Sequence, residues 1–190
     1  MKIDIDVPDG ISGDWSVRTF TVSKSDSDFT RIRAMMKGRG YVPQGTYKEL
    51  RRNGTIVMSN TPDEINDGLS FVYRASGNIL INGLGLGCVV KLLLNKPDVE
   101  KITIIEKSTD VISLVAPTYV TDKRVNIICA DAFDYKPPKG EHYNIVWHDI
   151  WDYITPDNID EMKKLHRKYG KISDFQMSWC RKECERANRY

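Results

Sequence analysis

The feature that most constrains this chain is a short apolar run that ends in three glycines at alternate positions. Residues 79–81 are too few for a helix and suit a strand buried on both faces. Gly83, Gly85 and Gly87 then allow a turn in which the backbone can approach a ligand that a Cβ would block. A helical apolar pattern follows from Val89, and its N-terminal amides point back at the turn. This order is typical of a nucleotide-like site; the alternative is a turn that merely joins strand to helix.

The overall composition is that of an ordinary globular protein. The chain has 190 residues, with 41% hydrophobic and 28% charged residues and a net charge of +2. This length suits one domain with a small appendage. The charge gives no global nucleic-acid or membrane signature, and no apolar run is long enough for a membrane span. Acids among the first residues are unlike a signal peptide, so we expect a cytoplasmic protein.

The four cysteines do not form a metal-binding pattern. None of them has paired C-x-x-C spacing, so we expect neither a zinc site nor another metal site. Cys88 and Cys129 stand in apolar surroundings and are expected to be small core residues. Cys180 and Cys184 are four residues apart on an expected helix, and free thiols fit a reducing cytoplasm.

The first 60 residues are expected to form a small appendage. Alternating apolar and acidic residues predict a strand at 3–7, followed by a turn at 8–10 and a second strand at 17–22. A helix over 27–37 would be capped by Ser25 or Asp26 and would end at Gly38.

A hairpin and a capped helix are expected next. Residues 46–58 read as a β-hairpin around Asn53-Gly54, the strongest short hairpin turn, and the segment 38–60 is expected to cover the site. Thr61 is a candidate N-cap with Pro62 after it, and Glu64 would close a capping box. This helix is expected to reach Arg74.

From residue 77 onward, apolar strands alternate with helices. Further strands are expected at 101–105, 125–129, 143–147 and 175–179. Helices are expected from the glycines to about 95, over 108–115 before Pro117, over 157–169, and at the C-terminus. Such alternation predicts a doubly wound, mainly parallel Rossmann-like α/β sheet. We therefore expect an α+β appendage at 1–60 and a Rossmann-like domain at 61–190.

Acidic residues follow three of these strands, where such sheets bind their ligands. Glu106 comes 23 positions after Gly83 and could accept two hydrogen bonds from a ribose diol; the alternative is a solvated loop charge. Asp131 could accept from an adenine amine, with an amide from Ala132 and an apolar face from Phe133. An Asx turn is the alternative for Asp131.

Asp149 and Asp152 follow the fourth strand and would lie over the reactive end of the ligand. Asp152 could instead simply start the next loop. Of the three histidines, His148 is the best placed beside Asp149, although a packing role is the commoner one for such a residue.

Together these segments resemble class I S-adenosylmethionine-dependent methyltransferases, and the spermidine-synthase-like branch in particular. The similarity covers residues 58–153 and includes Thr61, Asp63 and Glu64, which resemble a threonine and paired acids of that branch. The resemblance implies S-adenosylmethionine as cofactor, with Asp149 and Asp152 as catalytic residues. It implies a cofactor site made of Gly83, Leu84, Gly85, Gly87, Glu106, Lys107, Asp131, Ala132, Phe133 and Asp149.

The chain also departs from that branch. Leu86 stands where aminopropyltransferases carry an acid that pairs with an ammonium, and Ser108 replaces an aspartate. Gly68 and Leu69 fall where a tyrosine and a glutamate are expected, and the sheet has five predicted strands where the family usually has seven. Methyl transfer to an unidentified acceptor is therefore the leading hypothesis. Aminopropyl transfer and a non-catalytic nucleoside-binding or interaction module are the alternatives.

The expected partner is a small-molecule acceptor. A locally basic C-terminal stretch is a solvated face or, alternatively, a nucleic-acid patch; its cations are Lys163, Lys164, Arg167, Lys168, Lys171, Arg181, Lys182, Arg186 and Arg189. The open edge of a shortened sheet is one that a second copy could cover.

Overall fold

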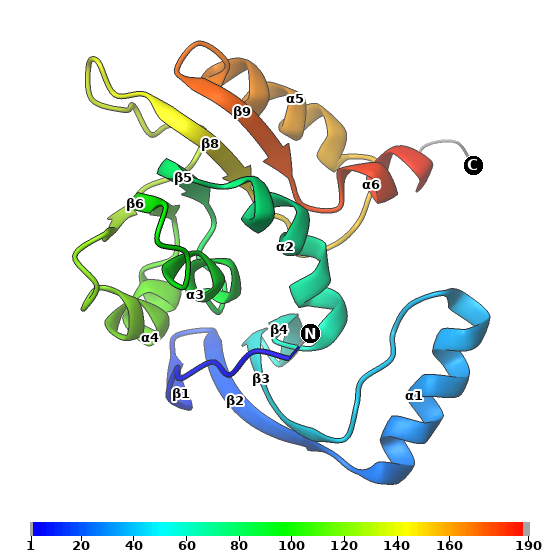
Figure 1. Ribbon diagram of the computed structural model, residues 1–190. Helices are drawn as coiled ribbons and strands as arrows, with labels where there is room; N and C mark the ends of the chain where they lie inside the picture. Colours follow the sequence, from blue (N-terminus) through cyan, green and yellow to red (C-terminus); the bar gives the residue numbers. More distant parts are fainter. Residues whose placement is uncertain (1, 188–190) are drawn as a thin grey trace.

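A computed structural model of the chain describes residues 2–187, and its strands form two sheets. One sheet has four strands and is antiparallel, and the other has five strands and is parallel. Figure 1 shows the antiparallel sheet below the parallel one. Some helices lie between the two sheets, and others lie on the side of the parallel sheet that faces away from the antiparallel sheet. The fold class is therefore confirmed as mixed α/β, with a small sheet from the N-terminal part.

The antiparallel sheet is a meander of strands in chain order. Its strands are β1 (Gly10–Ser12), β2 (Trp15–Val22), β3 (Gly45–Arg52) and β4 (Thr55–Ser59). The predicted hairpin is confirmed, because Asn53 and Gly54 join β3 to β4 with φ of 48° and 78°. Helix α1 (Lys24–Lys37) is inserted between β2 and β3.

Three predictions near the N-terminus are wrong. Residues 3–7 pair with no strand, although Ile5 and Val7 are buried as the alternation implied. Residues 8–10 lead into β1 instead of forming a turn. Helix α1 begins earlier than expected, because Ser23 is its N-cap and forms a reciprocal capping box with Asp26.

The parallel sheet has the strand order β7-β6-β5-β8-β9, and every neighbouring pair is parallel. Its strands are β5 (Gly77–Asn82), β6 (Val99–Glu106), β7 (Val125–Cys129), β8 (Tyr143–His148) and β9 (Ser173–Ser178). The first strand in sequence lies at the centre, so the chain winds outward in both directions from β5. This order creates a switch point beside β5, where ligands of such sheets bind.

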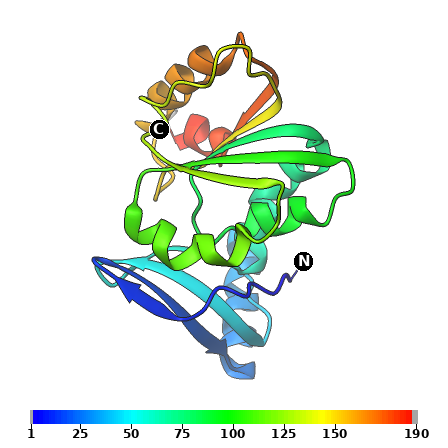
Figure 2. The same cartoon turned by 90° about the vertical axis from the view of Figure 1, so that its left-hand side faces the viewer.

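Helices cover both faces of the parallel sheet, as a doubly wound fold requires. They are α2 (Pro62–Arg74), α3 (Cys88–Leu94), α4 (Thr109–Tyr119), α5 (Asn158–Tyr169) and α6 (Arg181–Ala187). Residues of α2, α3 and α4 pack with Ile79 and Ile81 on one face, whereas α5 packs with Leu80 on the other. Figure 2 shows α4 between the two sheets.

Two expectations for this half need correction. Helix α4 continues through Pro117 to Tyr119, because the buried Tyr119 anchors the last turn and its hydroxyl donates to the Leu86 carbonyl at 2.8 Å. Cys129 is exposed at the end of an edge strand, whereas a core position was expected.

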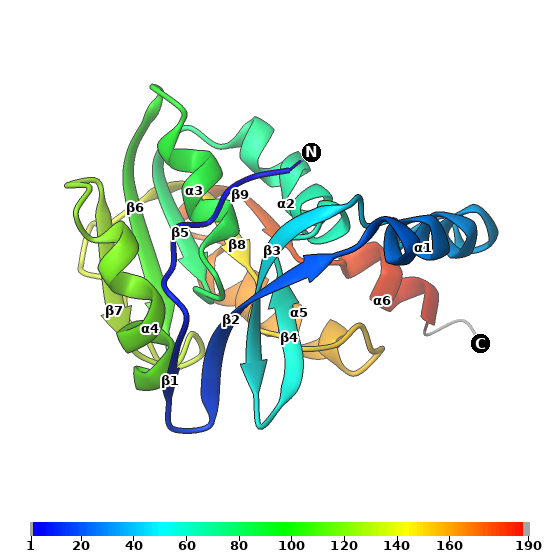
Figure 3. The same cartoon turned by 90° about the horizontal axis from the view of Figure 1, so that it is seen from below.

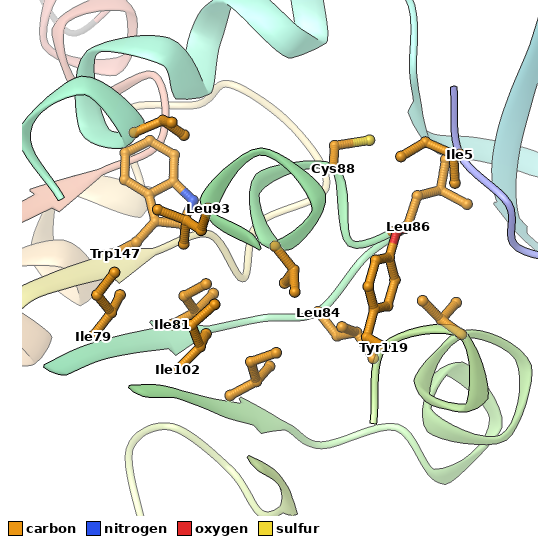
Figure 4. Close-up of a cluster of buried hydrophobic side chains, with 14 of the residues drawn as sticks. Ile5, Ile79, Ile81, Leu84, Leu86, Cys88, Leu93, Ile102, Tyr119 and Trp147 are labelled. Carbon is orange, nitrogen blue, oxygen red and sulfur yellow. Dashed lines mark hydrogen bonds between the residues drawn. The ribbon is translucent and has the colours of Figure 1, made fainter. Parts of the chain in front are cut away.

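One hydrophobic cluster joins the two sheets. It contains Ile5, Val17 and Leu50 from the N-terminal part together with Phe71 and Ile81 from the C-terminal part. Figure 4 shows the part of this cluster around the glycine turn, with Leu84, Leu86 and Tyr119 packed together. The boundary at residue 60 stays a prediction, since the two parts share this core.

Candidate functional site

The carboxyl ends of four parallel strands meet at one edge of the sheet. Backbone hydrogen bonds continue past the strands there: the Gly83 amide donates to Ile105, the Asp149 amide to Asn82 and the Ala130 amide to Glu106. A cavity of about 430 Å³ opens at this edge. This volume lies in the range of small-molecule sites.

The three glycines make a turn that packs closely against the protein itself. Their φ angles are 98°, 52° and 73° for Gly83, Gly85 and Gly87, all in the left-handed region. A Cβ on Gly83 would lie 1.9 Å from the Asp149 carbonyl oxygen, and one on Gly87 would lie 2.2 Å from the Tyr119 ring. A Cβ on Gly85 would lie 2.6 Å from the Met58 sulfur. Glycine is therefore required at these positions for internal packing, whatever ligand the turn meets.

Glu106 is oriented by two backbone amides. Its Oε2 accepts from the Leu84 amide at 2.9 Å, and its Oε1 accepts from the Ser108 amide at 2.8 Å. A carboxylate has about four acceptor sites, so two remain for a ligand in the cavity that Glu106 lines. The carboxylate is thus preorganised at the position expected of a ribose-binding acid.

Asp131 makes the Asx turn that was the alternative interpretation, but it also lines the cavity. Its Oδ1 accepts from the Phe133 amide at 2.8 Å. Helix α5 holds the same segment, because Lys168 Nζ donates to the carbonyls of Ala132 and Phe133 at 3.0 and 2.6 Å and the Tyr169 hydroxyl donates to Ala132 at 3.1 Å. The turn fixes the loop and still leaves acceptor capacity on the carboxylate.

Asp149 lies in the cavity lining with a second carboxylate, Glu64 of α2. Burial raises the pKa of Asp149 to about 7, although Trp147 Nε1 donates to its Oδ2 at 3.4 Å. Burial and the nearby charge of Asp149 raise the pKa of Glu64 to about 7 as well. Carboxyl groups with such pKa values can exchange protons near neutral pH.

The expected capping box between Thr61 and Glu64 is wrong. Thr61 is the N-cap residue of α2, with Pro62 after it, but its side chain makes no capping bond; its hydroxyl is 2.9 Å from that of Ser59. The only sequence signal for Glu64 as a site residue was the similarity of residues 61–64 to paired acids of the spermidine-synthase-like branch.

Asp152 lines the cavity but forms an ion pair with Arg52 of β3. The Arg52 guanidinium in turn lies 5.3 Å from the centre of the Trp15 ring. The carboxylate charge of Asp152 is therefore balanced from within the chain, unlike that of Asp149.

Nine of the eleven predicted site residues line this cavity. They are Gly83, Gly85, Glu106, Lys107, Asp131, Ala132, Phe133, Asp149 and Asp152. The Leu84 side chain is buried in the core, and only its amide reaches Glu106. Gly87 lies against Tyr119. Their roles as ligand contacts stay predictions.

His148 is a packing residue. It is fully buried, with Nδ1 2.8 Å from Asn82 Nδ2 and Nε2 3.0 Å from Gln176 Oε1. Burial lowers its pKa to about 3, so the neutral imidazole accepts from Asn82 and donates to Gln176. It is therefore unavailable as a base.

The antiparallel sheet supplies one wall of the cavity. The segment 38–60 is expected to cover the site, and four of its residues line the cavity: Leu50, Arg52, Val57 and Met58. Trp15 of β2 lies beside them in the lining. No local pattern marks these residues, since the sheet reaches the cavity only through tertiary packing.

The basic C-terminal stretch is used in part within the chain. Lys163 pairs with Asp160 at 3.0 Å, Arg181 pairs with Glu185 at 2.9 Å, and Lys168 faces the loop described above. Arg189 lies outside the described residues, and nucleic-acid binding stays a prediction.

In residues 2–187, none of the helices is both long and apolar enough to cross a membrane.

Comparisons with known proteins find similarity in structure. No protein-family model and no curated protein sequence matches the chain. Solved structures that resemble it include the CcbJ methyltransferase from Streptomyces caelestis, with 17% identity, a TM-score of 0.45 and coverage of 60% of this chain and 48% of that one. A spermidine synthase from Thermotoga maritima has 17% identity, a TM-score of 0.47 and coverage of 67% and 57%.

A third similar structure is the N-methyltransferase NodS from Bradyrhizobium japonicum WM9 in complex with S-adenosyl-L-homocysteine. It has 14% identity, a TM-score of 0.45 and coverage of 59% of this chain and 57% of that one. The chain thus spans about half the length of the proteins it resembles.

Proposed function

We propose that the cavity binds S-adenosylmethionine and that the protein transfers its methyl group to a small-molecule acceptor. The observation that carries this proposal is the convergence of Glu106 and Asp131 on one cavity beside the glycine turn. These two acceptors suit a nucleoside, because the carboxylates are separate and each can still accept hydrogen bonds from hydroxyl or amine groups of a ligand.

Each cavity residue has a definite part in this proposal. Glu106 would hold the ribose hydroxyls and Asp131 the adenine amine, with Phe133 as an apolar contact. The bound cofactor would supply an electrophilic methyl group for in-line transfer. Asp149 would accept a proton from the acceptor, since its pKa of about 7 leaves it half ionised at neutral pH. The protein would contribute mainly positioning and electrostatics.

Calorimetry with S-adenosylmethionine and S-adenosylhomocysteine tests the binding step. We expect both to bind, and we expect Glu106→Gln to weaken binding about 10- to 100-fold because a charged acceptor is lost. Glu100→Gln is the matched control, since Glu100 is exposed on the same strand and should leave affinity unchanged. Absence of binding by the folded wild-type protein would refute the proposal.

Aminopropyl transfer is the second candidate, and the Glu64–Asp149 pair favours it. Two carboxylates in one cavity can hold and deprotonate an amine. Against it, Leu86 is fully buried in the core and offers nothing to an ammonium group. A clear preference for decarboxylated over ordinary S-adenosylmethionine in the same calorimetric experiment would select this candidate; the reverse preference would exclude it.

A further inference from the structure

The last turns of α5 hold the loop that follows β7. Figures 1 and 3 show α5 beyond β8 and β9 as seen from α3 and α4, on the other face of the parallel sheet. Leu165 and Tyr169 lie one turn apart on α5, and both are buried in the hydrophobic cluster that contains Ala132. Lys168 lies beside them, and its ammonium group donates to two successive carbonyls of the loop, those of Ala132 at 3.0 Å and Phe133 at 2.6 Å.

One rigid peptide group connects this contact to Asp131. The Ala132 carbonyl also accepts from the Tyr169 hydroxyl at 3.1 Å, so two donors from α5 fix its direction. In residues 2–187 every peptide bond is trans, and the C=O and N–H groups of a planar trans peptide point in opposite directions. The N–H of this peptide group belongs to Phe133, and it donates to Asp131 Oδ1 at 2.8 Å. By holding the carbonyl, α5 therefore directs the amide at the Asp131 carboxylate.

The backbone carbonyls of this loop are turned into the protein. The Asp131 carbonyl accepts from the amides of Asp134 and Tyr135 at 3.0 and 2.8 Å. The carbonyls of three successive residues, 131–133, are thus bound within the chain, whereas the Asp131 side chain lines the cavity. Its carboxylate has about four acceptor sites, so the bond from the Phe133 amide leaves acceptors for a ligand. The loop therefore presents to the cavity a carboxylate whose direction α5 has set.

The charge of Lys168 acts on the same carboxylate. Burial lowers the pKa of Lys168, and the charges of Asp134 and Asp131 oppose that shift. The ammonium group therefore lies within electrostatic reach of Asp131, where a cation favours the ionised carboxylate. Donation to the Ala132 carbonyl also polarises the peptide group and strengthens its N–H as a donor to Asp131.

We propose that Lys168 is a positioning residue that makes the site selective for adenine, acting on Asp131 through the Ala132–Phe133 peptide. This inference rests on the proposed function, in which Asp131 accepts from the adenine amine. Hypoxanthine carries an oxygen in place of that amine and puts an acceptor opposite the carboxylate. Such a mismatch costs affinity only if the carboxylate is held in place, so the contacts of Lys168 set how strongly the two bases are distinguished.

Amide hydrogen exchange of the free protein, measured by NMR, tests the positioning step. Lys168→Met keeps a long side chain but removes the ammonium group, and we expect the Phe133 amide to exchange at least about tenfold faster in this variant. Lys164→Met is the matched control, since Lys164 is exposed one turn earlier on α5 and should leave the exchange unchanged. Circular-dichroism melts show that both variants are folded. An unchanged exchange rate at Phe133 in Lys168→Met overturns the proposal.

Calorimetry with S-adenosylhomocysteine and its hypoxanthine analogue, S-inosylhomocysteine, tests the selectivity. We expect the wild type to prefer the adenine ligand about 10- to 100-fold, and Lys168→Met to reduce this preference at least about fivefold. Lys164→Met should keep the full preference, and so should Lys168→Arg, because a guanidinium group can donate to both carbonyls. In an Asp131→Ala background the acceptor is gone, so adding Lys168→Met should change the preference no further.

The outcomes separate this inference from the proposed function. Folded wild-type protein that binds neither ligand refutes the proposed function and this inference with it. If the wild type binds S-adenosylhomocysteine but Lys168→Met weakens both ligands by the same factor, Lys168 has a structural role only and this inference alone is overturned. It is also overturned if the wild type does not distinguish the two ligands, or if Lys168→Met still lowers the preference in the Asp131→Ala background.

Discussion

At the scale of single residues, the carboxylates that line the cavity lie in different environments. Glu106 is held by two backbone amides and Asp152 by Arg52. Burial raises the pKa of both Asp149 and Glu64 to about 7, and at Glu64 the nearby charge of Asp149 adds to this rise. Groups with raised pKa values are the ones that exchange protons at neutral pH. The chemistry proposed for the site therefore falls on Asp149 and Glu64, with Glu106 and Asp131 left for binding.

The raised pKa of Asp149 predicts a pH-dependent cost to stability. The ordinary aspartate value is 3.8 and the folded value is about 7, so unfolding releases a proton in that range and the free energy of unfolding falls as pH rises from about 4 to 7. Asp149→Asn should therefore match the wild type at pH 4 and be more stable at pH 8, by up to about 4 kcal/mol. Urea denaturation at both pH values measures this.

The exposed residue Asp4 supplies the control for that experiment, since Asp4→Asn should follow the wild type at both pH values. The same Asp149→Asn variant should lose transferase activity while it gains stability. An Asp149→Asn protein that is less stable than the wild type at pH 8 would contradict the account.

At the scale of elements, the glycine turn connects β5 to α3 and also packs against more distant parts of the chain. Gly83 packs on the backbone after β8, Gly85 on Met58 of β4, and Gly87 on Tyr119 of α4. The turn thus contacts the segment that follows β8 of the parallel sheet, strand β4 of the antiparallel sheet and helix α4. Its shape is set by this packing before any ligand arrives.

Because of these contacts, we expect substitution by alanine to cost different amounts of stability at glycines that have similar backbone conformations. Gly87→Ala adds a Cβ 2.2 Å from the Tyr119 ring at φ 73°, and it should cost about 2–5 kcal/mol of stability from strain and overpacking. Gly140→Ala has φ 85° and no atom within 4 Å, so only about 1–2 kcal/mol is expected. Denaturant titration compares the two, and equal costs would show that the contact with Tyr119 is unimportant.

At the scale of the whole molecule, the two sheets share one core and one cavity. Leu50 of β3 is 1% exposed, belongs to the joint hydrophobic cluster and also lines the cavity. The antiparallel sheet is therefore expected to unfold together with the parallel sheet.

Leu50→Ala tests this coupling. It should destabilise the protein by about 2–5 kcal/mol, with loss of amide protection in both sheets. Native-state hydrogen exchange measures protection strand by strand. If only β1 to β4 lose protection, the two parts are independent domains, as the boundary at residue 60 implies.

The elements of the parallel sheet were largely predictable from sequence, because buried parallel strands are apolar runs and Gly83 to Gly87 mark the turn. Glu106, Asp131 and Asp149 were found by their position after strands, which is a local property. Glu64, Met58 and the Arg52–Asp152 pair were not, because their places in the cavity depend on packing between residues far apart in sequence.

A crystal structure of the protein with S-adenosylhomocysteine would test the central claim most directly. We predict the nucleoside in the cavity beside Gly83 and Gly85, with ribose hydroxyls within hydrogen-bond distance of Glu106 and the adenine amine near Asp131. A nucleoside bound elsewhere, or a cavity left empty at saturating ligand, would contradict the account.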